Sequence, residues 1–299
     1  MFRAMSEQCT AAARMPGAAW RVYRRHWLML VVSAALPACV VIVTIASEFA
    51  LRSGGAHALL ETTGTGLALG SLLALLRMAA LCFAALCWCW CAGVILVDDD
   101  FTLADCWQLA WRRSMTLLFA ALPLWFVFIF ALVSAAIAAR LLWTLFAVVG
   151  ASAGSLALLF LASIALPPVI AVAAKCCLVA PVAAFRQTRP LEALAEAFAK
   201  LPWRACARIW PVTAVCGAMI VATILLPAGA FVESVWRALA LAAPALVLAV
   251  QLVAAAIVWL AGAPGMIVAT MLYFELSPEL IAQLSDAAGD NAGQDDQEE

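Results

Sequence analysis

The chain has 299 residues, of which 67% are hydrophobic and only 12% are charged, and its formal net charge is -1. A soluble globular domain is nearer half apolar and a quarter charged, so a lipid bilayer has to surround most of this chain. The sequence has no basic stripe clear of its apolar runs, which argues against a nucleic-acid partner, and its odd count of 11 cysteines argues against a disulfide framework.

The chain begins with an amphipathic segment, roughly 6–25, that carries Arg21, Arg24 and Arg25 near its end. Such a segment suits the membrane interface, with arginine on the aqueous side. The apolar run that starts at Trp27 is too long for the core of a cleavable signal peptide and lacks a small-residue cleavage site. We therefore expect it to be the first permanent span.

Six apolar stretches are long enough to cross a bilayer, which takes roughly 20 residues in a helix. They cover residues 27–50, 68–97, 114–139, 155–185, 207–230 and 241–274. A transmembrane barrel would need short alternating strands, which the sequence does not contain. The predicted fold is an all-α integral membrane protein with six transmembrane helices.

A shorter amphipathic segment precedes each pair of spans and carries helix-start signals. Thr102 and Asp105 have the spacing of a capping box. Pro190 stands where a helix would begin, with Glu192 close to the positive end of the helix dipole. Ser277-Pro278-Glu279 again gives a cap, a first residue and an acid in that order.

These segments recur with a period of about 87 residues. Pro16, Leu103, Pro190 and Pro278 are separated by 87, 87 and 88 residues, and His26, Arg113 and Lys200 share a second phase. A fixed period of this size indicates a duplicated unit, here an interfacial amphipathic helix followed by a two-span hairpin. The predicted units are about 6–101, 102–188 and 189–276. They form one domain over 1–284, and residues 285–299 form an acidic, disordered cytoplasmic tail.

The basic residues predict the orientation. Twelve of them flank the spans on one side, and only Arg52, Arg140 and Arg237 flank them on the other. The positive-inside rule then places both termini in the cytoplasm of a bacterial inner-membrane protein.

Three charged residues lie within or beside spans and are the candidate site. Arg77 falls about ten residues into the second predicted span, where a charge is costly and is a functional hypothesis by default. It either lines a transport or ion path, reaches the outer interface, or pairs with Glu48. Lys175 lies in the fourth predicted span and is either part of such a path or directed toward the cytoplasm.

The run Cys87-Trp88-Cys89-Trp90-Cys91 resembles a thiolate cluster for a soft metal. In a helix only Cys87 and Cys91 share a face, so these two residues are weak metal candidates. The alternative is that the cysteines are small apolar fillers, and we predict neither a metal nor a cofactor.

Pro37, Pro123 and Pro211 lie at similar places in the first span of each unit. A proline there is either a transporter hinge or a static kink tolerated by packing. Their shared phase favours common ancestry of the units.

The opening Ala19-Trp20-Arg21 and the closing Met271-Leu272-Tyr273-Phe274-Glu275 resemble bacterial six-span proteins related to the membrane domain of glycerophosphodiester phosphodiesterases. A stretch from Ala180-Pro181 to Ala193-Leu194 adds to the resemblance, whereas the basic ending usual after the tyrosine is missing. The phosphodiesterase catalytic domain is absent, so the resemblance implies no hydrolase activity.

The expected function is a structural or accessory subunit of a membrane process, without a catalytic site of its own. Its partners would be the lipid bilayer and either another membrane protein subunit or a second copy. The alternative is a small-solute or lipid-associated transporter with a central path near Arg77, and a membrane enzyme comes third.

Overall fold

A computed structural model describes residues 2–53, 65–97, 102–123, 144, 175–186, 188–200 and 244–279. Its helices are α1 (Phe2–Ser33), α2 (Ala35–Ser53), α4 (Thr65–Val97), α7 (Val179–Phe185), α8 (Pro190–Lys200) and α13 (Pro244–Glu275). A further helix without a label covers residues 103–123. The described part of the chain contains no strand, so the prediction of an all-helical chain is confirmed for these ranges.

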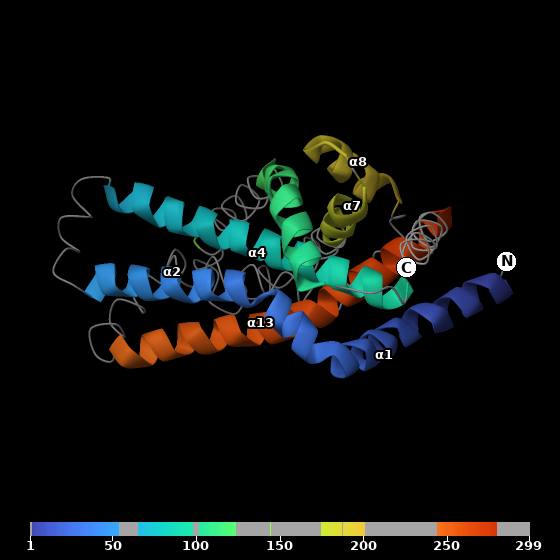
Figure 1. The fold of residues 1–299 in the computed structure, drawn as a ribbon, viewed down its shortest axis with the longest axis horizontal. Coiled ribbons are helices and arrows are strands. Elements are labelled where there is room, and N and C mark those ends of the chain that lie inside the picture. Colours follow the sequence, from blue (N-terminus) through green and yellow to red (C-terminus); the bar gives the residue numbers. More distant parts are fainter. Residues whose placement is uncertain are drawn as a thin grey trace, which may run out of the picture.

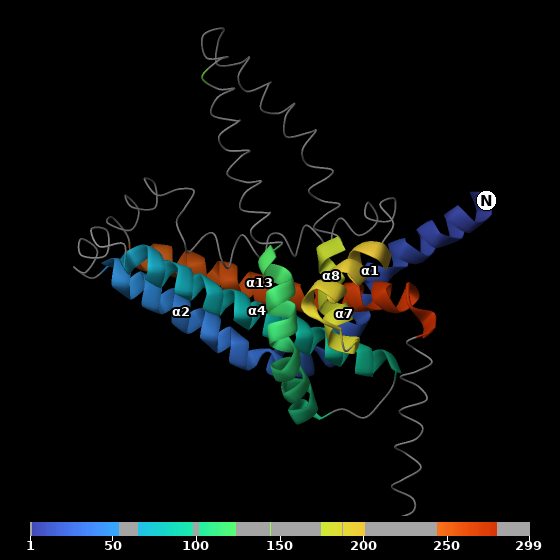
Figure 2. The same ribbon diagram turned by 90° about the horizontal axis from the view of Figure 1, so that it is seen from above.

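The long helices α2, α4 and the first half of α13 run side by side, and each of the three packs on the other two (Figures 1 and 2). Helix α1 turns away from α2 and packs on α13 and α4. The helix 103–123 crosses α4, and the short helices α7 and α8 pack on each other beside it (Figure 1). The start of α1 and the end of α13 lie at the same end of the molecule.

Two of these helices are long and apolar enough to cross a membrane, Leu72–Leu96 within α4 and Leu248–Glu275 within α13. A third crossing is added when Pro16–Ser33 and Ala35–Ala50 are taken together as one bent span. These three match the predicted spans 68–97, 241–274 and 27–50. The predicted spans 114–139 and 155–185 are only partly described, and 207–230 lies outside the described residues.

The first predicted span is not a straight helix, because it bends by 60° at Ala34 between α1 and α2. Pro37 follows three residues later, lacks a backbone N–H, and places its ring against the carbonyl of Ser33 in a regular helix. A second irregularity lies at His26, where φ is -118° and ψ is 20°. It falls at the predicted boundary between the amphipathic segment and the span.

Two tryptophans from other helices donate hydrogen bonds to carbonyl groups beside the bend. The Trp107 indole N–H donates to the carbonyl of Ser33 at 2.9 Å, in place of the N–H that Pro37 lacks. The Trp88 indole N–H donates to the carbonyl of Leu30 at 3.0 Å. The helix 103–123 and α4 therefore both stabilise the bend. The sequence analysis did not predict these two contacts.

Helices α4, α7 and α13 meet at Gly93. A Cβ atom added to Gly93 would lie 2.3 Å from the ring of Phe185, so only glycine allows this approach. Phe185 stacks on Trp90 with ring centroids 5.8 Å apart and contacts Phe274 at 5.0 Å. The ring is held from two sides and cannot easily move away from α4.

The helix-start signals were read correctly. The Asp105 N–H donates to the Thr102 hydroxyl at 3.2 Å, Pro190 is the first residue of α8, and the Arg189 N–H donates to the Glu192 carboxylate at 3.0 Å. One boundary differs, because the helix 103–123 continues past Arg113 with no break between the amphipathic segment and the start of the third span.

Candidate functional site

Arg77 lies on α4 and directs its guanidinium to α2. Its Nη2 group is 2.6 Å from the Glu48 carboxylate and donates to the Thr44 carbonyl at 2.9 Å, while its Nε group donates to the Thr44 hydroxyl at 3.1 Å. The Arg77 side chain is only 1% exposed, and Glu48 and Thr44 are buried too. We call Arg77, Glu48 and Thr44 the Arg77 cluster.

Pairing with Glu48 was one of three interpretations of Arg77, and the structure shows this pair. Arg77 does not extend to the surface, since its side chain is almost fully covered. Two opposite charges held by further hydrogen bonds tolerate an apolar environment that neither tolerates alone. The cluster joins the two helices of the first hairpin.

Lys175 is buried as well, and its ammonium group reaches α8. It donates to the carbonyl of Phe198 at 2.6 Å and lies 5.5 Å from the centre of the Phe198 ring. Phe198 belongs to the last turn of α8, where carbonyl groups lack helical partners and attract a cation. The structure does not bring Lys175 and Arg77 together, because Lys175 contacts α8 whereas Arg77 contacts α2.

The cysteines of α4 pack in the core. Cys87 and Cys91 are both fully buried and face the helix 103–123, where the Cys106 sulfur lies 3.8 Å from the Cys91 sulfur and 3.7 Å from the Cys87 carbonyl. Cys89, on another face, lies 3.9 Å from the Met266 sulfur. Within the described ranges, no group of three or more His, Cys, Asp or Glu side chains is placed to hold a metal ion.

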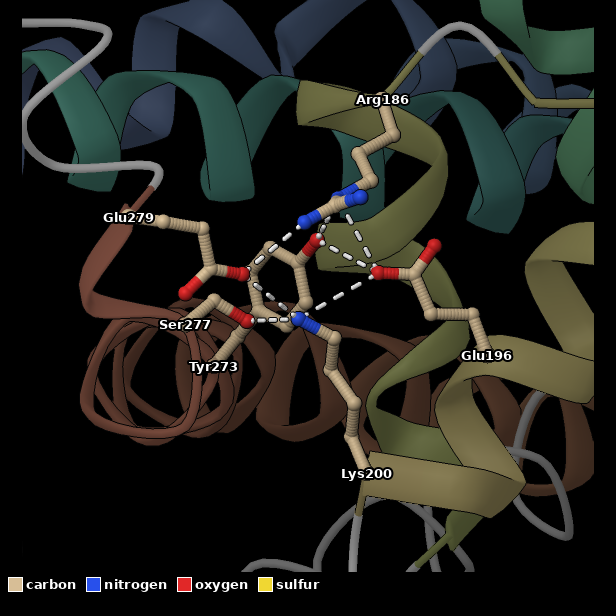
Figure 3. Close-up of polar contacts among 6 residues, drawn as sticks. All are labelled: Arg186, Glu196, Lys200, Tyr273, Ser277 and Glu279. Atoms are coloured by element: carbon tan, nitrogen blue, oxygen red, sulfur yellow. Dashed lines mark hydrogen bonds and ion pairs between the residues drawn. The ribbon is translucent and has the colours of Figure 1, made fainter.

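A second polar cluster lies where α7, α8 and α13 end (Figure 3). We call it the Arg186 cluster, and it consists of Arg186, Glu196, Lys200, Tyr273, Ser277 and Glu279. Glu196 contacts Arg186 at 3.0 Å and Lys200 at 3.5 Å, and Glu279 contacts the same two side chains at 3.1 and 3.3 Å. The two carboxylates approach the two basic groups from opposite sides (Figure 3).

Tyr273 lies between the two basic side chains of this cluster. Arg186 donates to its hydroxyl at 3.2 Å, and the Lys200 ammonium lies 5.4 Å from the centre of its ring. Lys200 also donates to the Ser277 hydroxyl. The cluster therefore connects the ends of three helices with the segment that follows α13.

The surroundings of Arg186 and Glu279 in this cluster shift the pKa values of both groups. Burial acts to lower the pKa of Arg186, but the Tyr273 hydroxyl and the two carboxylates outweigh it, so this pKa is raised. The pKa of Glu279 lies below its ordinary 4.5, first through hydrogen bonding to its own backbone and then through Lys200 and Arg186. Both shifts stabilise the charged forms.

The sequence analysis did not bring the Arg186 cluster together. One signal was present, because Arg186 and Tyr273 are 87 residues apart, which is the repeat period. The contact between Cys106 and Cys91 had no comparable signal.

Comparison with known proteins adds no family: the chain matches no family model, no curated protein and no solved structure.

Proposed function

We propose that this chain is a structural or accessory subunit of a membrane process, without a catalytic site of its own. The observation that carries the proposal is the Arg77 cluster, because the buried guanidinium contacts Glu48 and Thr44 of one neighbouring helix, α2. Such a charge serves to join two helices, whereas a charge that handles a solute has to be reachable from water.

The proposal includes six spans in three tandem units, with both termini in the cytoplasm of a bacterial inner membrane. Two contacts support the repeat. Arg113 donates to the Arg186 carbonyl at 3.1 Å, and Lys200 lies over the Tyr273 ring, in each case 73 residues further along the chain. Each basic residue opens the hairpin of its unit and touches the end of the same hairpin. The resemblance to phosphodiesterase membrane domains is part of this proposal.

The experiment is recovery of the partner from native membranes. The tagged full-length chain is extracted with a mild detergent, and the bound proteins are quantified by mass spectrometry. We expect one membrane protein, or a second copy of this chain, at a fixed stoichiometry. Recovery of the chain alone as a monomer, after mild chemical crosslinking as well, would contradict an accessory role.

A second candidate is a transporter of a small solute with a path near Arg77. It is favoured by the 60° bend at Ala34, since interrupted spans are typical of transporter binding sites. The variant Arg77→Leu/Glu48→Leu separates the two candidates. If the chain is an accessory subunit, the double variant should complement a deletion strain. If it is a transporter that uses Arg77, the double variant should fail to complement that strain.

A further inference from the structure

In the Arg186 cluster, a carboxylate oxygen of Glu279 lies between two basic groups, at a position that an oxygen of an anionic ligand could occupy. Oε1 of Glu279 lies 3.1 Å from Nη2 of Arg186 and 3.3 Å from Nζ of Lys200. The guanidinium and the ammonium therefore share a single oxygen. Arginine and lysine side chains bind the oxygens of phosphate groups through the same charge-assisted contacts.

The two carboxylates of the cluster are not equivalent. Glu196 shares α8 with Lys200, one turn away, and its side chain is 18% exposed. Glu279 lies after the end of α13, and its side chain is 52% exposed. Glu196 is thus a built-in part of the cluster, whereas Glu279 is half-exposed and reaches the cluster from the opposite side (Figure 3).

The basic groups exceed what Glu196 alone can balance. The Arg186 guanidinium contacts both carboxylates of the cluster, and so does the Lys200 ammonium. Once Glu279 has left, two basic groups face one carboxylate, Glu196. The cluster also lies at the ends of α7 and α13, at the side of the membrane that the basic residues assign to the cytoplasm, where anionic lipid headgroups collect.

We propose that Arg186, Lys200 and the Ser277 hydroxyl form a binding site for a phosphate group, and that Glu279 occupies this site in the ligand-free protein. The phosphate belongs either to an anionic phospholipid headgroup or to a free phosphate anion, which present the same oxygens. Binding displaces the Glu279 carboxylate from Arg186 and Lys200. This site is independent of the accessory role proposed above.

The test compares the full-length wild type with Glu279→Gln, Lys200→Gln and the double variant. Glu275→Gln is the matched control, because Glu275 is an exposed carboxylate of the same region outside the Arg186 cluster. One arm measures retention of phosphatidylglycerol against phosphatidylcholine by native mass spectrometry. The other arm measures inorganic phosphate binding by calorimetry in a neutral detergent.

We expect Glu279→Gln to bind one of the two probes on the order of fivefold more tightly, the size of one exposed ion pair. Lys200→Gln should abolish this gain in the double variant, and Glu275→Gln should bind like the wild type. A gain with phosphatidylglycerol alone assigns a lipid, and a gain with inorganic phosphate assigns a soluble anion.

Equal affinity of Glu279→Gln and the wild type for both probes would overturn the proposal. So would a gain that survives Lys200→Gln, since the site would then lie elsewhere. If Lys200→Gln does not elute as a single species, Ser277→Ala takes its place, because it removes a hydroxyl and leaves every charge.

Discussion

The Arg77 cluster and the Arg186 cluster use the same chemistry in different surroundings. Each pairs an arginine with a glutamate, at 2.6 Å in the first and 3.0 Å in the second. The arginine side chain is 1% exposed in the first and 34% exposed in the second. The comparison teaches that the number of ion pairs says little about stability, because exposure decides what each pair contributes.

The largest expected effect breaks the pair in the Arg77 cluster. Arg77→Leu removes the positive charge that pairs with the buried Glu48 carboxylate, so we expect a loss of about 3–5 kcal/mol in the free energy of unfolding. Adding Glu48→Leu should restore most of this loss. SDS titration of the purified protein measures both values.

The matched substitution in the other region is Arg186→Leu, for which we expect a loss of about 1 kcal/mol or less, because water replaces the lost contacts. Equal losses for Arg77→Leu and Arg186→Leu would break the comparison and mean that burial does not separate the two clusters.

The second prediction tests whether substitutions in α4 that involve no charge also lower the stability of the protein. Gly93→Ala should cost about 1–3 kcal/mol, since the added Cβ meets the Phe185 ring, which Trp90 and Phe274 hold in place. Gly70→Ala on the same helix has nothing within 4 Å of the added Cβ and should stabilise α4 slightly. Chemical denaturation of the two variants side by side gives the difference, and similar values for both would rule out tight packing at Gly93.

The third prediction concerns a buried polar contact without charge. The loss of stability on removing it should be smaller than for Arg77→Leu and larger than for Arg186→Leu. Trp107→Phe keeps a ring but removes the donor to the Ser33 carbonyl, at an expected cost of about 1–2 kcal/mol. The cost should shrink when Pro37→Ala is present, because alanine supplies its own N–H to Ser33. A double-mutant cycle measures this coupling.

The control on the same helix is Trp111→Phe, because the Trp111 side chain is 75% exposed. We expect almost no change in stability there. Additive effects of Trp107→Phe and Pro37→Ala would show that the tryptophan does not replace the proline's missing donor.

The smallest expected effect is a pH dependence in the exposed region. The pKa of Glu279 is lowered in the folded protein, so its contribution is present at neutral pH and is lost as the pH falls through that pKa. A fluorescent label placed next to residue 279 should therefore report displacement of the Glu279 carboxylate only at a pH below the ordinary glutamate pKa of 4.5. With Glu279→Gln the label should report the displaced state at every pH.

The sequence predicted local features well because their causes are local. The cap at Thr102 and the start of α8 at Pro190 depend on residues within one helical turn, and both were confirmed. The apolar runs of α4 and α13 likewise fixed the element type. The bend at Ala34 was harder, because Pro37 allowed either a kink or a hinge and the outcome depends on Trp88 and Trp107 far along the chain.

The candidate site shows the same limit. Arg77 was singled out as costly in a membrane, but its sequence position left three interpretations open, and only the packing of α2 on α4 selects the pair with Glu48. The Arg186 cluster draws residues from four segments, and none of them is unusual where it stands in the sequence. Six spans and three units stay predictions, since the described residues include only part of the third and fourth spans and none of the fifth.

The contact between Trp107 and Ser33 has a consequence for the order in which the protein is made. The two residues are 74 positions apart, and a ribosome adding 5–20 residues per second needs about 4–15 seconds to cover that distance. During this interval the first span is already synthesised while the donor for the Ser33 carbonyl does not yet exist. The bend at Ala34 therefore reaches its final form only after the helix 103–123 has left the ribosome, so the first span is completed by a later part of the chain.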